Sequence, residues 1–259
     1  MMGDGSMLKC RLIARLDIKP PYLVKTVCLE GVRKVGDPID FVRKYDAEGI
    51  DEILLLDIVG SLYRKNRLLE LVERVGEFAF CPLTVGGGIR SVDDAKAVLR
   101  VGADKIAINT AAIERPALIN ELAHKFGNQC VTLQIDAKQK GEGWEAYCDG
   151  ARQPTGRDAV EWASEGVARG CGEILLTSID REGTGQGLDA RLVRAVAANT
   201  GVPVVASGGA RVSGHIVEAI EAGASAVAVA GLLHYNRATI REIKEAMVAG
   251  GIPTRVLAA

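Results

Sequence analysis

The second half of the chain repeats the first at a nearly constant spacing. The segment Gly49–Asp57 (GIDEILLLD) aligns with Gly170–Ser178 (GCGEILLTS), an offset of 121 residues from position 49 to position 170. The segment Pro82–Arg90 (PLTVGGGIR) aligns with Pro203–Arg211 (PVVASGGAR) at the same offset. Solenoid and propeller units repeat about every 20 to 50 residues. The longer period therefore indicates two copies of a half that contains several elements.

Short apolar segments alternate with amphipathic helical patterns through both halves. Nearly unbroken apolar runs predict parallel strands that are covered on both faces. The expected strands are Arg11–Asp17, Glu52–Asp57, Leu83–Val85, Lys105–Ile108, Val131–Asp136, Glu173–Thr177, Val204–Ser207 and Ala226–Val229. Helices are expected to open at Asp37-Pro38, Ser91, Asp158, Asp189 and Ser213.

A strand followed by a helix, eight times over, predicts an α/β protein: a single (β/α)₈ TIM barrel built from two repeated half-barrels. An open doubly wound sheet is the alternative, but it would leave the two halves inequivalent. The 259 residues suit one such barrel. We expect residues 1–6 to be an N-terminal extension and residues 7–259 to form one catalytic barrel domain.

The charge balance and the chain start narrow the functional classes. Lys and Arg number 32 against 33 for Asp and Glu, which argues against bulk attraction to nucleic acid or membranes. No apolar run reaches the length of a membrane helix. The start (MMGDGSMLKC) lacks the pattern of a secretion signal. A cytoplasmic protein is therefore expected.

The cysteines and histidines do not form a recognisable ligand pattern. Six cysteines show no C-x-x-C spacing, and the three histidines are scattered. The thiols are typical of a reduced cytoplasmic protein. We expect neither a metal site nor a cofactor.

Two aspartates end repeat-equivalent strands. Leu16–Lys19 (LDIK) aligns with Ile135–Lys138 (IDAK) at an offset of 119, the difference between 16 and 135. This places Asp17 and Asp136 at the C-terminal ends of the first and fifth strands, where TIM barrels carry their chemistry. A lone aspartate there often only binds loop amides. A matched pair favours general acid and base catalysis, although the sequence leaves open which group is which.

Two glycine-rich turns precede helices in equivalent positions. Glycine lets the backbone approach an anion closely, and free N–H groups at a helix start favour phosphate. Each turn alone could be purely steric, but the repeated pair favours a ligand with a phosphate at each end. The first cradle is expected to comprise Gly87, Gly88, Asn109 and Thr110, and the second Ser207, Gly208, Gly209, Ala230 and Gly231.

Further polar residues follow the strands at the same end of the predicted barrel. Lys25 could fold over the opening, or it could equally be a solvated loop lysine. The polar insert Gln139–Gly156 is expected to be a flexible loop or hairpin on the catalytic rim. The residues that follow the sixth strand are expected to form a polar rim: Thr177, Asp180, Gly183 and Thr184.

Four charged residues begin strands at the opposite end of the predicted barrel. They are Arg11, Glu52, Lys105 and Glu173, of which Glu52 and Glu173 are repeat equivalents. Charges at that end usually serve stability. A ring of alternating signs could also gate a small polar species.

Several stretches together resemble one family. The chain from Met7 onward is similar to the cyclase subunit of imidazole glycerol phosphate synthase, a histidine-biosynthesis enzyme. The stretches that carry the resemblance are RLIARLDIK, GDPIDFVRKYDAEGIDEILLLDI, PLTVGGGIRS, GADKIAINTAA, FGNQCVTLQIDAK and GEILLTSIDREGTGQG.

The resemblance implies a reaction, a partner and residue roles. Ammonia released from glutamine by a separate glutaminase subunit would react with a ribulosyl aminoimidazole carboxamide bisphosphate. The products would be imidazole glycerol phosphate and an aminoimidazole carboxamide ribotide. The family's acid and base fall on Asp17 and Asp136, and its mobile-loop lysine falls on Lys25. Its phosphate cradles fall on the two glycine turns, and its ammonia gate falls on the four-residue charged ring.

The chain departs from the family pattern at the substrate end. Arg15 stands where a cysteine is usual, Glu182 replaces an aspartate, and Gly231 replaces a serine. The first loop contains Pro20-Pro21, which stiffens it because proline fixes φ.

These departures keep alternatives open. One is a paralogous barrel subunit that delivers ammonia for sugar or surface-polysaccharide amidination. Another is a non-catalytic barrel that activates a glutaminase. The related isomerase of the same pathway shares the repeat, but the charged ring and LTSIDREGT fit it less well.

Overall fold

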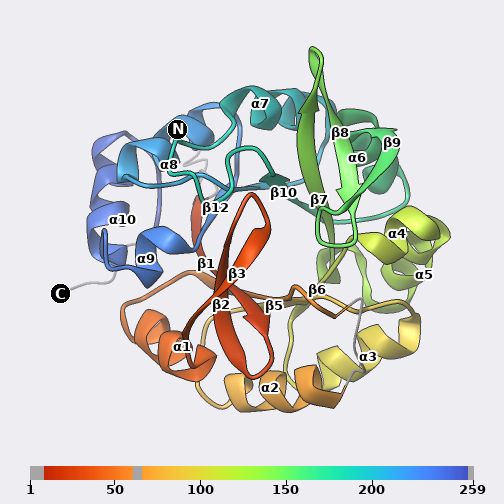
Figure 1. Cartoon of the computed structure of the whole chain (residues 1–259), viewed down its shortest axis with the longest axis horizontal. Helices are drawn as coiled ribbons and strands as arrows, with labels where there is room; N and C mark the ends of the chain where they lie inside the picture. Colours follow the sequence, from red (N-terminus) through yellow and green to blue (C-terminus); the bar gives the residue numbers. More distant parts are fainter. Residues whose placement is uncertain (1–8, 61–65, 256–259) are drawn as a thin grey trace, which may run out of the picture.

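The computed structural model describes residues 9–60 and 66–255, within which eight parallel strands close into a barrel (Figure 1). In order around the barrel they are β1 (Arg11–Lys19), β4 (Glu52–Asp57), β5 (Leu83–Gly86), β6 (Lys105–Ile108), β7 (Val131–Lys140), β10 (Glu173–Ser178), β11 (Val204–Ser207) and β12 (Ala226–Val229). Pairing of β1 with β12 and of β7 with β10 completes the ring. The predicted TIM barrel is confirmed. The expected extension, residues 1–6, lies outside the described residues.

Helices form an outer ring around the strands (Figure 1). They are α1 (Pro38–Ala47), α2 (Asn66–Gly76), α3 (Val92–Arg100), α4 (Thr110–Glu114), α5 (Ala117–Phe126), α6 (Ala159–Ala168), α7 (Ala190–Asn199), α8 (Ser213–Glu221), α9 (Gly231–His234) and α10 (Ile240–Ala249), with a 3₁₀ turn, η1 (Asn128–Cys130). Their apolar faces pack on the outside of the barrel, where they form the larger of two cores.

Helices begin at all five predicted positions, and at four of them the predicted residue caps the helix. Asp37, Ser91, Asp158 and Asp189 each accept a hydrogen bond from a backbone N–H in the first turn of the helix that follows. Ser213 does not cap its helix, because it is already the first helical residue and Val212 precedes it.

The two halves of the chain share backbone geometry at repeat-equivalent positions. Gly87 has φ +99° and its equivalent Gly208 has φ +94°. Asn109 (φ −127°, ψ −85°) and its equivalent Ala230 (φ −121°, ψ −83°) also match. The repeat in the sequence is therefore also a structural repeat. The two sides of the opening at the C-terminal ends of the strands have the same backbone geometry.

The barrel interior is filled rather than hollow. Side chains alternate along each strand, so every second residue points inward. A separate apolar cluster occupies the middle of the barrel: Ile13, Leu54, Leu56, Ala107, Leu175, Val205, Ala226 and Ala228. In the part of the chain that the structure describes, this apolar cluster separates the charged residues at one end of the barrel from those at the other.

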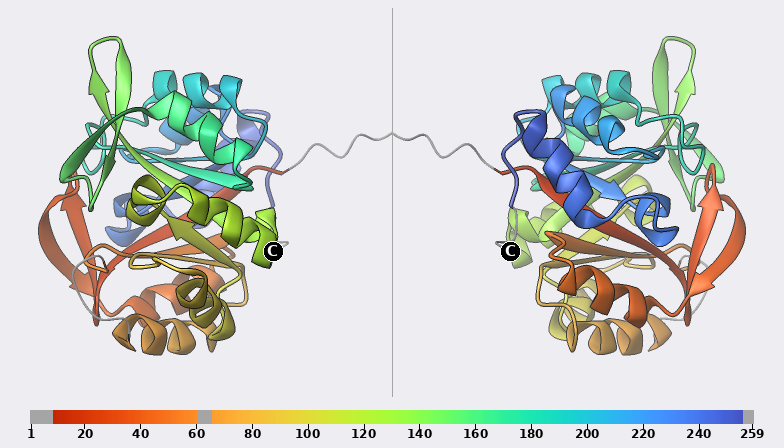
Figure 2. Two further views of the ribbon diagram at one scale, coloured as in Figure 1. Left: turned by 90° about the vertical axis from the view of Figure 1, so that its right-hand side faces the viewer. Right: turned by 90° about the vertical axis from the view of Figure 1, so that its left-hand side faces the viewer.

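Two β-hairpins rise from the same end of the barrel (Figure 2). In the first, β7 continues past the barrel and pairs antiparallel with β8 (Gly143–Cys148), which pairs with β9 (Gln153–Asp158). This confirms the hairpin reading of the insert Gln139–Gly156.

The second hairpin follows β1, where the sequence predicted a loop. β2 (Tyr22–Val27) pairs antiparallel with the end of β1, and β3 (Glu30–Gly36) pairs with β2. The prediction of a loop at Lys25 is therefore wrong. The turn between β2 and β3 uses Cys28 (φ +50°) and Leu29 (φ +61°), residue types that rarely adopt positive φ. The usual glycine or asparagine signal of a hairpin is consequently absent.

Candidate active site

The two strand-ending aspartates stand on opposite sides of the opening. β1 and β7 are four places apart in the ring of eight, and both carboxylates are buried, with 1% of each residue exposed. Asp17 Oδ2 is buried and has no hydrogen-bond partner among the described residues. Burial raises the pKa of Asp136, and the positive charge of Arg15 opposes this rise.

Each aspartate accepts a hydrogen bond from the residue two positions before it. Arg15 Nε donates to Asp17 Oδ1 at 2.8 Å, and Gln134 Nε2 donates to Asp136 Oδ2 at 3.1 Å. Arg15 and Gln134 are repeat equivalents at the same offset of 119 as the aspartates, from 15 to 134. The two halves therefore hold their carboxylates alike, but one donor is a cation and the other is a neutral amide.

Arg15 lies at the centre of the opening. It is 2% exposed, and its Nη1 also donates to Thr177 Oγ1 at 2.9 Å and to Ser207 Oγ at 3.1 Å. Sequence reasoning identified it as a departure from the family but gave it no role. Strand alternation was the available signal, because a residue two positions before a catalytic aspartate points into the same space.

A cavity of about 440 Å³ occupies the side of the opening near β5, β6 and β7. Its lining brings together the first predicted cradle (Gly87, Gly88, Asn109 and Thr110) with Asp136, Gln134 and Arg15. Gly87 has positive φ, and a Cβ there would lie 2.2 Å from the carbonyl oxygen of Asp57. Asn109 Nδ2 donates to Asp136 Oδ2 at 2.9 Å, which links this cradle to the carboxylate.

A second cavity of about 320 Å³ occupies the side near β11 and β12. Its lining brings together the second predicted cradle (Ser207, Gly208, Gly209, Ala230 and Gly231) with Lys25, Gly183 and Arg15. Arg15 and Thr26 are shared by both linings. The two cavities thus meet at Arg15.

Lys25 reaches the second cavity from the hairpin rather than from a loop. It is 8% exposed, forms a salt bridge with Glu182, and donates to the carbonyl oxygen of Thr26 at 2.8 Å. The backbone N–H of Cys28 also donates to the carbonyl oxygen of Glu182 at 2.9 Å. Glu182, another departure from the family, therefore fixes the hairpin and its lysine over the second cradle.

Four of the site residues predicted at this end of the barrel line neither cavity. Thr177 lies under Arg15 as its hydrogen-bond acceptor. Asp180 accepts from the backbone N–H of Gln139 at 2.8 Å, and Thr184 donates to the carbonyl oxygen of Arg181 at 2.7 Å. Asp17 is the fourth, and it lies beside Arg15. A ligand in the cavities thus meets Arg15 where the sequence predicted Asp17.

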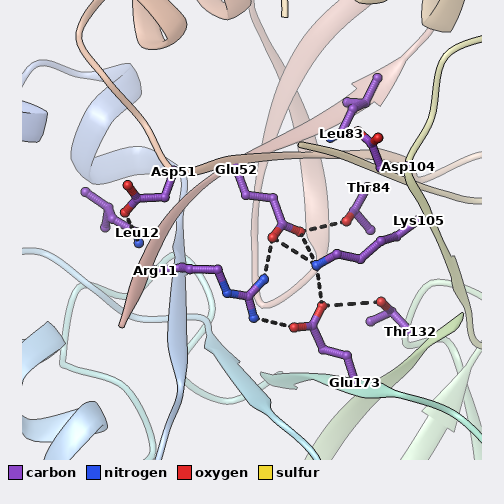
Figure 3. A network of polar contacts seen from close by, with 10 residues as sticks. All are labelled: Arg11, Leu12, Asp51, Glu52, Leu83, Thr84, Asp104, Lys105, Thr132 and Glu173. Carbon is purple, nitrogen blue, oxygen red and sulfur yellow. Dashed lines mark hydrogen bonds and ion pairs between the residues drawn. The ribbon is translucent and has the colours of Figure 1, made fainter. Parts of the chain in front are cut away.

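The charged ring closes the opposite end of the barrel (Figure 3). Arg11 bridges Glu52 and Glu173, and Lys105 Nζ lies 3.0 Å from a carboxylate oxygen of each glutamate. Thr84 Oγ1 donates to Glu52 at 2.7 Å. The structure brings all four predicted ring residues into one ion-pair network, and the apolar core of the barrel separates it from Arg15.

Comparison with known proteins identifies the family. The sequence model of a histidine biosynthesis protein family matches residues 11–239. The chain is 48% identical over 250 residues to imidazole glycerol phosphate synthase subunit HisF of Pyrococcus furiosus, covering 96% of this chain and 100% of the relative. It is 50% identical over 252 residues to the HisF subunit of Myxococcus xanthus, covering 97% and 100%. The chain belongs to the HisF family.

Membership in the HisF family confirms the predicted enzyme class. HisF is the cyclase subunit of imidazole glycerol phosphate synthase, a lyase of histidine biosynthesis, and the relatives' designation as subunits implies a partner subunit. The family assignment favours the cyclase over the amidination paralogue and the isomerase. No helix in residues 9–60 and 66–255 is long and apolar enough to cross a membrane. Across the same residues, no three or more His, Cys, Asp or Glu side chains are grouped to hold a metal ion.

Proposed function

We propose that this HisF-family chain uses ammonia to convert a ribulosyl aminoimidazole carboxamide bisphosphate into imidazole glycerol phosphate and aminoimidazole carboxamide ribotide. The reaction depends on two carboxylates, those of Asp17 and Asp136. The observation that carries the proposal is the placement of two buried carboxylates on opposite strands, with a glycine-lined cavity on each side. A substrate with a phosphate at each end would hold its reacting carbons between them.

The cradles suit phosphate for steric and electrostatic reasons. At Gly87, Gly88, Gly208 and Gly209 the backbone has positive φ, and added Cβ atoms would collide with neighbouring backbone. Such turns leave backbone N–H groups free to approach an anion. The second cradle also holds the buried ammonium group of Lys25, which can approach a phosphate there while Glu182 offsets part of its charge.

The charged ring supports ammonia entry from a glutaminase partner at the opposite end. Uncharged ammonia crosses an apolar barrel core at far lower cost than ammonium, because desolvating a charge is expensive. A path from the ring would pass the apolar cluster that includes Ile13, Leu54 and Leu175 before reaching Arg15. We propose that Arg11, Glu52, Lys105 and Glu173 form the gate to this path.

The chemistry requires matched proton transfers. Ammonia adds to a ketone, and water then leaves. In each of these two steps, one proton leaves the nitrogen and one reaches the oxygen. Carboxyl groups within reach of both atoms serve such transfers, and burial brings their pKa closer to the working pH.

Turnover without the partner tests the proposal. The purified chain is expected to form both products from the bisphosphate when ammonium salt is supplied at alkaline pH, and to form neither from glutamine alone. Product formation is followed by chromatography, with a HisF subunit of known activity assayed in parallel. If the reference subunit turns over and this chain does not, the cyclase function is excluded and the ammonia-delivering or non-catalytic alternatives stand.

A further inference from the structure

The two halves of the site are alike in backbone but unlike in charge. In one half Asp17 accepts from the guanidinium of Arg15, and in the other the donors to Asp136 within residues 9–60 and 66–255 are the neutral amides of Gln134 and Asn109. The carboxylates therefore cannot behave alike, although they occupy equivalent places in the repeat.

Accessibility separates them further. Asp136 lines the first cavity, Asp17 lines neither, and Arg15 lines both. Nε and Nη1 of Arg15 are held by Asp17, Thr177 and Ser207, which leaves Nη2 without a hydrogen bond among the described residues. A ligand that spans both cavities must pass this guanidinium.

We propose that Arg15 is a catalytic residue of this chain and that Asp17 acts through it. Asp17 is the hydrogen-bonded partner that positions the guanidinium, Arg15 polarises the ketone oxygen, and Asp136 is the carboxyl group that exchanges protons with the substrate. This inference rests on the proposed function and assigns the roles within it.

One carboxyl group can both give and take the proton that each step requires. As the nitrogen of ammonia bonds to the ketone carbon, the carbonyl π bond breaks and its electron pair moves to the oxygen beside Arg15. Protonated Asp136 gives a proton to this oxygen, and the resulting carboxylate takes one from the nitrogen. The same exchange accompanies loss of water, when the carbon–oxygen bond breaks and a carbon–nitrogen double bond forms.

The surrounding charges are consistent with these roles of Arg15, Asp17 and Asp136. Burial raises the pKa of Asp136, which favours its protonated form. Burial lowers the pKa of His234 to about 4, so this neighbour is neutral at physiological pH. Arg15, Asp17 and Asp136 act on one another electrostatically. The other charged groups that act on them or on His234 are Glu182, Lys25 and Lys44.

A double-mutant cycle on ammonium-driven turnover tests the division. Arg15→Gln copies the neutral donor of the other half and is expected to lower kcat by about 10²-fold, as loss of a donor to a developing oxyanion does. Asp17→Asn is expected to lower kcat similarly, and the double variant to be no worse than either single variant, because the pair acts as a unit. Arg15→Lys is expected to recover part of the loss.

An independent readout follows the carboxyl groups themselves. In ¹³C NMR of aspartate-labelled protein, with the signal assigned through Asp136→Asn, Asp136 is expected to titrate above the ordinary range of an aspartate, because burial raises its pKa. Arg15→Gln is expected to raise this midpoint further, since it removes a nearby positive charge. The wild-type midpoint alone tests the idea if the variant does not fold.

The outcomes separate this inference from the proposed function. Full activity of Arg15→Gln beside an inactive Asp17→Asn would show that Asp17 transfers protons itself, and would overturn the inference alone. A wild-type Asp136 that titrates within the ordinary range of an aspartate would do the same. Full turnover by both aspartate variants would overturn the proposed function, and the inference would fail with it.

Discussion

Asp136→Asn is expected to lower ammonium-driven turnover by about 10²- to 10⁴-fold and to leave the barrel folded. The asparagine keeps the size of the side chain and can still accept from Asn109 and Gln134, so the local packing survives. It cannot give or take a proton at this position. Steady-state kinetics with saturating ammonium salt measures the effect.

The matched control is Asp40→Asn, on the exposed face of α1, which should leave turnover unchanged. Asp17→Asn offers a further contrast, because it leaves Arg15 buried without its carboxylate. Removing one partner of a buried ion pair costs about 3–5 kcal/mol of stability. A lower melting temperature is therefore expected for Asp17→Asn than for Asp136→Asn. Wild-type turnover by Asp136→Asn would remove this residue from the chemistry.

Gly209→Ala is expected to weaken bisphosphate binding by about tenfold to a hundredfold, equal to the loss of about 1.5–3 kcal/mol from a charged hydrogen bond. The residue has φ +106°, and a Cβ would lie 2.2 Å from the carbonyl oxygen of Gly187. The turn must shift, which displaces the backbone N–H groups of the second cradle. Calorimetric titration without ammonia measures the dissociation constant, since no turnover occurs.

Gly214→Ala is the matched control, because a Cβ in that part of α8 meets no atom within 4 Å. It should bind the bisphosphate as the wild type does and fold at least as stably. Far-UV circular dichroism verifies that Gly209→Ala retains its fold. An unchanged dissociation constant in a folded Gly209→Ala protein would return this glycine turn to a purely steric role.

Much of the fold could be predicted because its strands are buried on both faces. The predicted bounds of Glu52–Asp57, Lys105–Ile108 and Val204–Ser207 agree with the structure, since apolar runs between turn residues mark such strands directly. The hairpin of β2 and β3 was missed because β3 is largely exposed and its turn carries Leu29 at positive φ. Neither feature produces the usual pattern of a hairpin.

The site residues that occupy equivalent positions in the two halves could be predicted from the sequence. Matching strand ends indicated Asp17 and Asp136, and matching turns indicated both cradles. The pairing of Arg15 with Asp17 and of Lys25 with Glu182 joins residues that depart from the repeat or follow different strands. Strand alternation could have placed Arg15 beside Asp17, but the contact between Lys25 and Glu182 depends on how the barrel closes, which no local pattern encodes.

The proposed reaction requires one bisphosphate to span both cradles with its ketone between the two strand-ending aspartates. A crystal structure of the Asp136→Asn protein with the bisphosphate tests this most directly, because the variant binds substrate without consuming it. We expect one phosphate on Gly88 and Asn109, the other on Gly209 and Gly231, and the ketone oxygen beside Arg15. A ligand with either phosphate outside its cradle, or with its ketone away from positions 15 and 136, would contradict the account.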